Sequence, residues 1–259
     1  MSLVLTSIDR GVCTITLADE ARRNALSGAM LHELLDAIDV AEAHPNVRVV
    51  VLTNQGRTFC AGADLSEQRE AAPGTRPPVG LVDLLQRIRQ SPKPFVGRID
   101  GHCVAGGVGL AAVLDVAVAA RGVTFGFTEV RLGLAPAMIA VVCLAKMRRV
   151  DAQEAFLRGT RFDSDEAARM GLIAHAVARE DLDATVEDVV NDLLAGEPGA
   201  IGEIKRLLNV VPTLDADEAF AWTAELSARL FTSAAAREGM SAYLEKRPAA
   251  WVRRLDDER

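Results

Sequence analysis

The sequence lacks any run of apolar residues long enough for a membrane-spanning helix, which needs about 18 in a row. Its first residues, MSLVLTSIDRG, also lack the basic start and the long apolar stretch of a secretion signal. We therefore expect a cytoplasmic protein with no membrane partner. The 259 residues, 49% of them hydrophobic, suffice for one sizeable core, so one main domain with an appendage is expected.

Cysteine is scarce and positive charge is not in excess. The four cysteines lie far apart and form no C-x-x-C pair, which argues against a metal site or a disulfide framework and favours buried thiols. With 36 acidic and 29 basic residues the net charge is −7, so the chain has no overall basic surface for nucleic acid. A polyanionic ligand would need a local basic patch.

Three motifs that often mark an enzyme class are also absent. No G-x-G-x-x-G opens a long helix in the first β-α-β unit, which argues against a dinucleotide-binding fold. The G-x-S-x-G turn of serine hydrolases and the H-E-x-x-H of zinc proteases are missing as well.

The first half of the chain alternates between β-rich and helical patterns. Two β-rich runs flank the Asp-Arg-Gly turn at 9–11 and predict a hairpin. Ser27 can cap a helix that ends before Pro45, and the apolar run at 47–53 predicts a buried strand. Such alternation indicates an α/β fold with largely parallel strand pairing.

The rest of the chain continues this alternation and then becomes helical. The segment 66–80 contains three prolines and is expected to be a mobile loop without helix or strand. Asp163 and Glu166 form a D-x-x-E capping box for a short helix that Gly171 closes. Further helices are predicted at 81–88 and near 182–195, 198–210 and 215–247, with strands at 95–100, 124–127 and 173–177. The helical tail is expected to serve packing or assembly.

Two loops of small residues precede predicted helices, at 60–64 (CAGAD) and at 105–109 (AGGVG). Small side chains let a ligand approach the backbone closely, and free N–H groups at a helix N-terminus suit a developing oxyanion. Each loop alone has a structural alternative, because glycine also permits a tight turn between a strand and a helix.

Glu129 follows the short apolar strand TFGF and precedes another apolar run. A carboxylate in apolar surroundings has its pKa raised towards neutrality, which suits general acid–base catalysis. The alternative is an ordinary glutamate at the start of a helix.

Taken together, these segments resemble a known family. The strings FCAGADL (59–65), DGHCVAGGVGL (100–110) and FTEVRLGLAP (127–136), in this order and spacing, are similar to those of the crotonase superfamily, or enoyl-CoA hydratase/isomerase family. The resemblance covers essentially the whole chain. It implies a spiral of ββα turns over residues 1–196, an α-helical trimerisation region over 197–259, and a homotrimer or hexamer.

The resemblance also implies a site for an acyl-CoA thioester, with no separate cofactor and no metal. The thioester oxygen would lie between the backbone N–H groups of Ala61 and Gly106, and Glu129 would act as acid and base. The residues implied to contact coenzyme A are Arg22, Asn24, Ala25, Ala63, Asp64, Leu65, Tyr243 and Lys246. Tyr243 and Lys246 would reach the CoA of a neighbouring subunit. Arg22 and Lys246 have the alternative of being ordinary solvated side chains.

One position departs from the family's hydratases, which generally use two glutamates. The first of these positions is Gly109 here. We expect an enoyl-CoA hydratase that works with Glu129 alone, acting on a branched or carboxylated acyl group for which Gly109 leaves room. A Δ3-Δ2-enoyl-CoA isomerase needs only one carboxylate and is the first alternative. A weakly catalytic acyl-CoA-binding protein and an acidic interaction protein are alternatives of another class.

Overall fold

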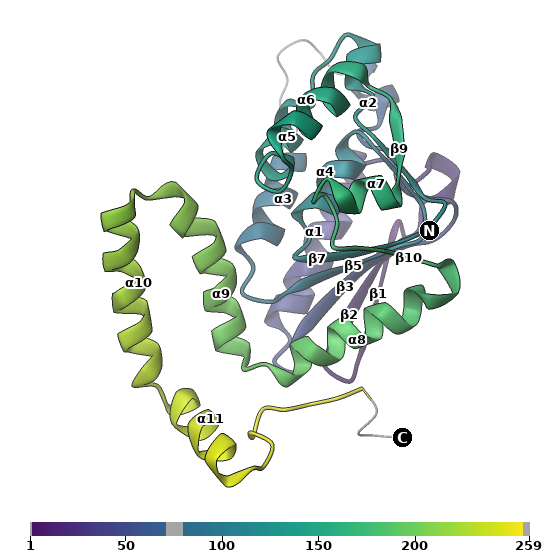
Figure 1. Cartoon of the computed structure of the whole chain (residues 1–259). Helices are drawn as coiled ribbons and strands as arrows, with labels where there is room; N and C mark the ends of the chain where they lie inside the picture. The colour runs from purple at the N-terminus through teal and green to yellow at the C-terminus, as the bar shows by residue number, and fades with distance from the viewer. Residues whose placement is uncertain (1, 71–79, 256–259) are drawn as a thin grey trace.

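The computed structural model of the chain describes residues 2–70 and 80–255, which form two β-sheets with helices packed on them (Figure 1). The larger sheet has the order β1-β2-β3-β5-β7-β10, with strands Val4–Asp9, Val12–Leu17, Val49–Asn54, Phe95–Ile99, Val116–Ala120 and His175–Val177. The smaller has the order β4-β6-β8-β9, with strands Thr58–Cys60, His102–Val104, Thr124–Gly126 and Arg161–Asp163. The predicted α/β class is confirmed.

The chain begins with the predicted hairpin. β1 and β2 pair antiparallel from Val4↔Leu17 to Asp9↔Val12, which leaves a two-residue turn. Arg10 and Gly11 in that turn both have positive φ, 43° and 83°, as the tight turn of a twisted hairpin requires.

The centre of the larger sheet is parallel and buried. β3 pairs parallel with both β2 and β5, and every residue of β3 is buried. The first helix, α1 (Gly28–Ala43), begins at Ser27, whose Oγ accepts a hydrogen bond of 3.2 Å from the Met30 N–H. Its apolar stripe packs in the core, as does that of α3 (Leu81–Gln90). The largely parallel pairing and both helices were predicted from the sequence.

The smaller sheet brings three short strands into register. β4, β6 and β8 run parallel, with Cys60 opposite Cys103 and Cys103 opposite Phe125, so their carboxyl ends meet at one edge. α4 (Gly106–Val113) begins directly after β6, at this edge. Beyond β8, the Phe127 ring packs on Phe156 with a centroid distance of 4.4 Å, which fixes the chain just before the short 3-10 helix η2 (Glu129–Leu132).

The segment after β4 differs from its prediction. Leu65–Glu70 is a helix, α2, rather than a loop, because the Asp64 Oδ1 accepts a hydrogen bond of 2.9 Å from the Ser66 N–H at its start. The prediction rested on prolines at 73, 77 and 78, which lie outside the described residues. The mobility expected of residues 71–79 therefore stays a prediction.

The remaining helices follow β8 in the sequence. They are α5 (Ala137–Cys143), α6 (Arg149–Arg158), α7 (Ser164–Arg169), α8 (Leu182–Ala195), α9 (Pro198–Val210), α10 (Ala216–Phe231) and α11 (Ala234–Glu245), with 3-10 turns at Glu20–Arg22 (η1), Arg179–Asp181 (η3) and Val211–Thr213 (η4). In the described residues, no helix has the length and apolarity to cross a membrane.

Helices α9, α10 and α11 form an arm that extends away from the sheets (Figure 1). The buried Lys205 anchors the arm, because its Nζ lies 2.6 Å from Asp115 Oδ2 and donates to the carbonyls of Ile88 and Lys93. The predicted single helical stretch at 215–247 is wrong: it divides before Ser233, whose Oγ caps α11. Trimerisation by this arm and the domain boundary at 196/197 stay predictions.

Candidate active site

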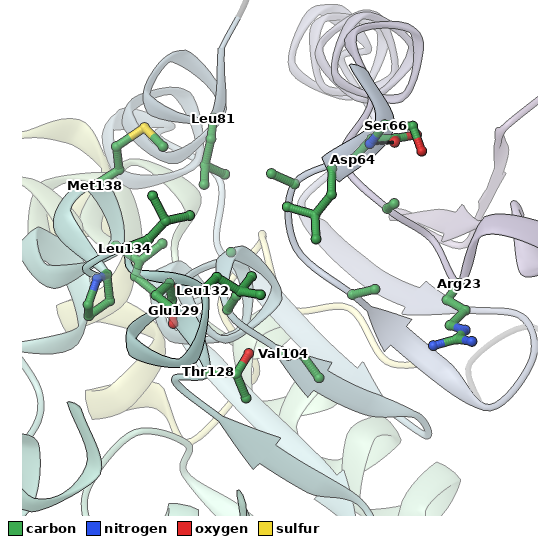
Figure 2. A pocket seen from close by; sticks show the side chains of 18 of the residues that line it. Arg23, Asp64, Ser66, Leu81, Val104, Thr128, Glu129, Leu132, Leu134 and Met138 are labelled. Carbon is green, nitrogen blue, oxygen red and sulfur yellow. Dashed lines mark hydrogen bonds between the residues drawn. The ribbon is translucent and has the colours of Figure 1, made fainter. Parts of the chain in front are cut away.

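A pocket of about 540 Å³ opens at the carboxyl ends of β4 and β6 (Figure 2). One wall consists of the segments 21–25 and 61–66. The other consists of Leu81, η2 and the start of α5, and the N-terminus of α4 lies between the two walls. The pocket therefore collects segments that lie far apart in the sequence.

The two glycine loops are pressed against each other at this pocket. A Cβ on Gly62, which has φ 87°, would lie only 3.0 Å from the Gly106 nitrogen. A Cβ on Gly107 would lie 2.1 Å from the Cys60 carbonyl oxygen, closer than real Cβ atoms come. Both glycines are required so that the backbones of the two loops can touch.

Two backbone N–H groups are unpaired where the loops meet. Those of Ala63 and Gly106 have no acceptor among the residues that the structure describes, and both residues line the pocket. A Cβ on Gly106 would lie 3.6 Å from the Ala63 nitrogen, so the two residues are neighbours in space. Gly106 is the first residue of α4, where the helix dipole favours negative charge. This pair can bind one developing oxyanion.

The residue before Gly106 has a strained backbone. Ala105 has φ 49° and ψ −118°, a region that only glycine adopts easily. Its N–H donates to the Gly126 carbonyl at 2.9 Å, which holds the turn to the end of β8. Strain of this kind costs about 1–3 kcal/mol and persists where the surrounding structure imposes it. Here it sets the direction of the chain that presents the Gly106 N–H.

Glu129 supplies the pocket with a desolvated carboxylate. Its Oε2 is buried and has no hydrogen-bond partner in the described part of the chain. Burial raises the pKa of Glu129, and a hydrogen bond from its own backbone N–H opposes this less strongly. Figure 2 shows it between Thr128 and the side chains of Leu132 and Leu134. The raised pKa makes this carboxyl a better proton acceptor than an exposed glutamate, which suits general acid–base catalysis.

The thiol of Cys143 adds to the apolar surroundings of this carboxylate. Burial, followed by the nearby charge of Glu129, raises the pKa of the buried Cys143 to about 12. Cys143 therefore stays a neutral thiol on α5 and brings no second charge to the site.

The basic groups of the pocket lie at the opposite wall. Arg22 is paired with Asp19 at 3.3 Å and with Asp64 at 3.8 Å. Arg23 has φ 56° and pairs with no carboxylate within the described residues; Figure 2 shows it across the pocket from Glu129. The pocket is thus cationic on one side and apolar around Glu129.

Residues 7–254 match the family described as enoyl-CoA hydratase/isomerase. The chain belongs to this family. Enoyl-CoA hydratase EchA19 of Mycobacterium tuberculosis is 30% identical over 239 residues, which are 90% of this chain and 90% of that protein. The 1,2-epoxyphenylacetyl-CoA isomerase of Escherichia coli is 29% identical, over 95% of this chain and 97% of that one. The crystal structure of an enoyl-CoA hydratase from Mycobacterium smegmatis superposes with a TM-score of 0.88 at 32% identity, covering 96% and 98%.

Membership of the hydratase/isomerase family implies an acyl-CoA substrate, and most of the residues that the resemblance implied for its site line this pocket. Arg22, Ala25, Ala61, Ala63, Asp64, Leu65, Gly106 and Glu129 all line the pocket. In the described residues there is no cluster of three His, Cys, Asp or Glu side chains that could hold a metal ion.

The donor predicted at Ala61 is wrong. The Ala61 N–H already donates to the Arg23 carbonyl at 3.1 Å, whereas the Ala63 N–H has no acceptor within residues 2–70 and 80–255. Ala61 and Ala63 stand on either side of Gly62, whose φ of 87° turns the chain between them, so spacing alone could not tell which N–H stays free. The sequence pattern does not show that Leu26 pairs with residues 62 and 63. This pairing decides which of the two N–H groups is left free.

Asn24 was expected to contact coenzyme A, but it does not line the pocket. It is fully buried, and its Nδ2 donates to the carbonyls of Thr58 at 2.7 Å and Gln55 at 3.2 Å. Its Oδ1 accepts a hydrogen bond of 2.8 Å from the Asp19 N–H. Asn24 therefore shapes the loop that carries Arg22 and Arg23, and its side-chain amide is engaged within the protein.

Gly109 lies one turn into α4, but the space beside it is not open. A Cβ there would lie 2.2 Å from Ile139 Cγ2 and 2.6 Å from Ile139 Cβ. The expectation that Gly109 leaves room for a bulky acyl group is therefore wrong, because α5 places Ile139 in that room.

Tyr243 and Lys246 are at the end of the arm. Tyr243 is exposed and Lys246 ends α11 with φ 54°, and neither lines the pocket. Figure 1 shows α11 far from α4 and α5. Their role at the CoA of a neighbouring subunit stays a prediction.

Proposed function

We propose that this protein is an enoyl-CoA hydratase, which adds water across the double bond of a 2-enoyl-CoA thioester. The proposal is carried by the buried Oε2 of Glu129, which lies in the same pocket as the N–H groups of Ala63 and Gly106. None of these three groups has a hydrogen-bond partner in the part of the chain that the structure describes. The name of the relative from Mycobacterium tuberculosis, an enoyl-CoA hydratase, gives further support.

In the proposed reaction the thioester oxygen accepts hydrogen bonds from the Ala63 and Gly106 N–H groups. Glu129 takes a proton from water as the water oxygen bonds to carbon 3, and the electron pair of the double bond moves towards the thioester oxygen. Glu129 then returns the proton to carbon 2. Each N–H donor contributes on the order of 3 kcal/mol to stabilising the enolate-like transition state. The raised pKa of Glu129 suits a group that both accepts and donates a proton.

Isomerisation of a 3-enoyl-CoA to a 2-enoyl-CoA is the second candidate. Ile139 occupies the space beside Gly109, and Asp64, the other carboxylate of the pocket lining, is paired with Arg22. A single free carboxylate can move a proton from carbon 2 to carbon 4, with the same two N–H groups holding the dienolate oxygen. This arrangement needs no ordered water.

The coenzyme A end is proposed to lie along the loop of Arg22 and Arg23. Arg23, which has no carboxylate partner in the described residues, is the stronger phosphate ligand of the two. We further propose a cytoplasmic homotrimer or hexamer in which Tyr243 and Lys246 approach the coenzyme A of a neighbouring subunit.

The test is a panel of 2-enoyl-CoA and 3-enoyl-CoA thioesters, followed by the absorbance of the conjugated double bond. A hydratase removes this absorbance from 2-enoyl substrates, whereas an isomerase creates it from 3-enoyl substrates. The Glu129→Gln variant should bind acyl-CoA and leave both absorbances unchanged. Binding without turnover by the wild type would indicate an acyl-CoA-binding protein, and failure to bind any acyl-CoA would refute the proposal.

A further inference from the structure

Ile139 and Gly109 form an unusually close pair at the inner end of the pocket. The Ile139 side chain lies where any side chain at position 109 would begin, because a Cβ there would be 2.2 Å from Ile139 Cγ2. Gly109 is fully buried, and Ile139 is only 2% exposed. The absence of a side chain on α4 therefore lets α5 approach and insert Ile139.

Ile139 also belongs to the pocket wall. It lines the pocket together with Leu132 of η2, Leu134 of the segment that follows η2, and Met138 of α5. Figure 2 shows these three apolar side chains on the same side of the pocket as Glu129. A β-branched side chain on a helix has essentially one rotamer, so Ile139 forms a rigid surface rather than an adaptable one. Its position on α5, between the pocket and Gly109, makes it the limit of the pocket on that side.

Charge is distributed unevenly along this pocket. Its described cations, Arg22 and Arg23, lie on the wall opposite η2 and α5. Among the described lining residues, the side of Glu129 offers no cation to a second carboxylate. A charged acyl group placed there would be desolvated beside the Glu129 carboxylate, which is unfavourable for both charges.

We infer that Ile139 is the residue that selects the acyl group, and that the acyl group is an uncharged, apolar chain whose length or branching Ile139 limits. The inference rests on one part of the proposed function, namely that the ligand is an acyl-CoA thioester whose acyl group lies at Glu129. Because Ile139 packs directly against Gly109, its side chain cannot move away from the pocket unless α5 moves as well. A chain that extends past Glu129 towards α4 therefore meets a fixed apolar barrier.

The test compares Ile139→Ala with the wild type and with Val141→Ala. Val141 is an exposed apolar residue on the same helix that does not line the pocket, so its variant controls for the loss of an apolar side chain from α5. Two series are measured: the Kd of saturated acyl-CoA thioesters from butyryl to decanoyl, and kcat/KM for the matching 2-enoyl thioesters. Thermal melts of all three proteins accompany them.

Ile139→Ala should shift the preference of long over short chains by about tenfold or more, the scale of a few methylenes in an apolar pocket, and Val141→Ala should not. If Ile139→Ala does not fold, Ile139→Val, which removes one methyl group, should give a smaller shift in the same direction. An unchanged chain-length profile in the folded variant would overturn the inference. So would wild-type protein that binds glutaryl-CoA as tightly as butyryl-CoA.

The saturated thioesters separate this inference from the proposed reaction. They undergo no hydration or isomerisation, so their Kd profile reports the acyl pocket alone. A shifted Kd profile without any turnover of enoyl thioesters would keep the role of Ile139 and refute the hydratase. Turnover that depends on Glu129, together with an unchanged Kd profile of Ile139→Ala, would support the proposed reaction and refute the role of Ile139.

Discussion

Replacing Glu129 by Gln should stabilise the protein at neutral pH while abolishing most of its activity. Glu129 is half-buried among apolar side chains, and its Oε2 has no partner in the described structure. Ionising the carboxyl group there costs free energy that the unfolded chain does not spend. The amide of Gln has nearly the same shape and never carries the charge.

The pH dependence follows from the direction of the pKa shift. Burial raises the pKa of Glu129 in the folded state above its ordinary value of 4.5. Below the unfolded pKa the carboxyl is protonated in both states and the charge has no effect. As the pH rises from there through the folded pKa, the wild type loses stability, by about 1.4 kcal/mol for each unit of the shift. The Gln variant does not lose this stability. The difference in unfolding free energy between the variant and the wild type should therefore grow with pH and then level off.

The assay is a set of thermal melts of both proteins between about pH 4.5 and pH 8.5, the range over which a raised carboxyl titrates. For a chain of this size, 1 kcal/mol corresponds to roughly 2–4 °C in Tm. Turnover of the variant should fall by about 10²–10⁴, the usual contribution of a general acid–base group. A Tm difference independent of pH, or a variant less stable than the wild type at pH 8.5, would contradict the reasoning.

Three further changes test the other parts of the site. Replacing Ala63 by lactic acid exchanges its backbone N–H for an ester oxygen and should lower kcat by about 10²–10³. The same change at Ala61 is the control: it should lower Tm but have a smaller effect on kcat. Lys246→Ala should raise KM for CoA thioesters with little change in kcat, and an equal loss with N-acetylcysteamine thioesters, which lack the CoA phosphates, would refute a phosphate contact. Gly109→Glu should lower Tm by at least several degrees, because its clash with Ile139 alone corresponds to about 1–3 kcal/mol of overpacking and it also buries a carboxylate. Combined with Ile139→Ala it should cost less than the sum of the two single changes, and a melt unaffected by Gly109→Glu would contradict the geometry.

The local features of the fold could be predicted because each depends on neighbouring residues. The positive-φ turn at Arg10-Gly11 and the cap at Ser27 are where the sequence placed them. Asp163 caps its helix through the Glu166 N–H at 2.8 Å, and Gly171 follows the end of that helix with φ 83°. The other half of the predicted capping box is wrong, because the Glu166 carboxylate pairs with Arg169. The missed division before Ser233 had a local signal too, since Ser is a good N-cap residue.

The parts of the site that could not be predicted depend on packing between distant segments. Whether Ala61 or Ala63 offers its N–H is decided by the loop of Arg23 and Leu26, which occupies one side of the 61–63 segment. What fills the space at Gly109 is decided by how α5 lies on α4, and no pattern within either helix contains that information. Asn24 matched the motif, yet its hydrogen bonds to Gln55 and Thr58 turn it inward.

The two proposed oxyanion donors, the N–H groups of Ala63 and Gly106, belong to the main chain and not to side chains. Mutation of the codons for Ala63 or Gly106 cannot delete an N–H group unless it introduces proline, so this part of the machinery persists through sequence drift as long as the residues stay small. The side chains proposed to decide the reaction and the substrate, Glu129 and Ile139, lie on other elements and can vary independently. If the proposal holds, the N–H groups can stay constant while the reaction changes, and the names of two relatives with about 30% identity do report different reactions.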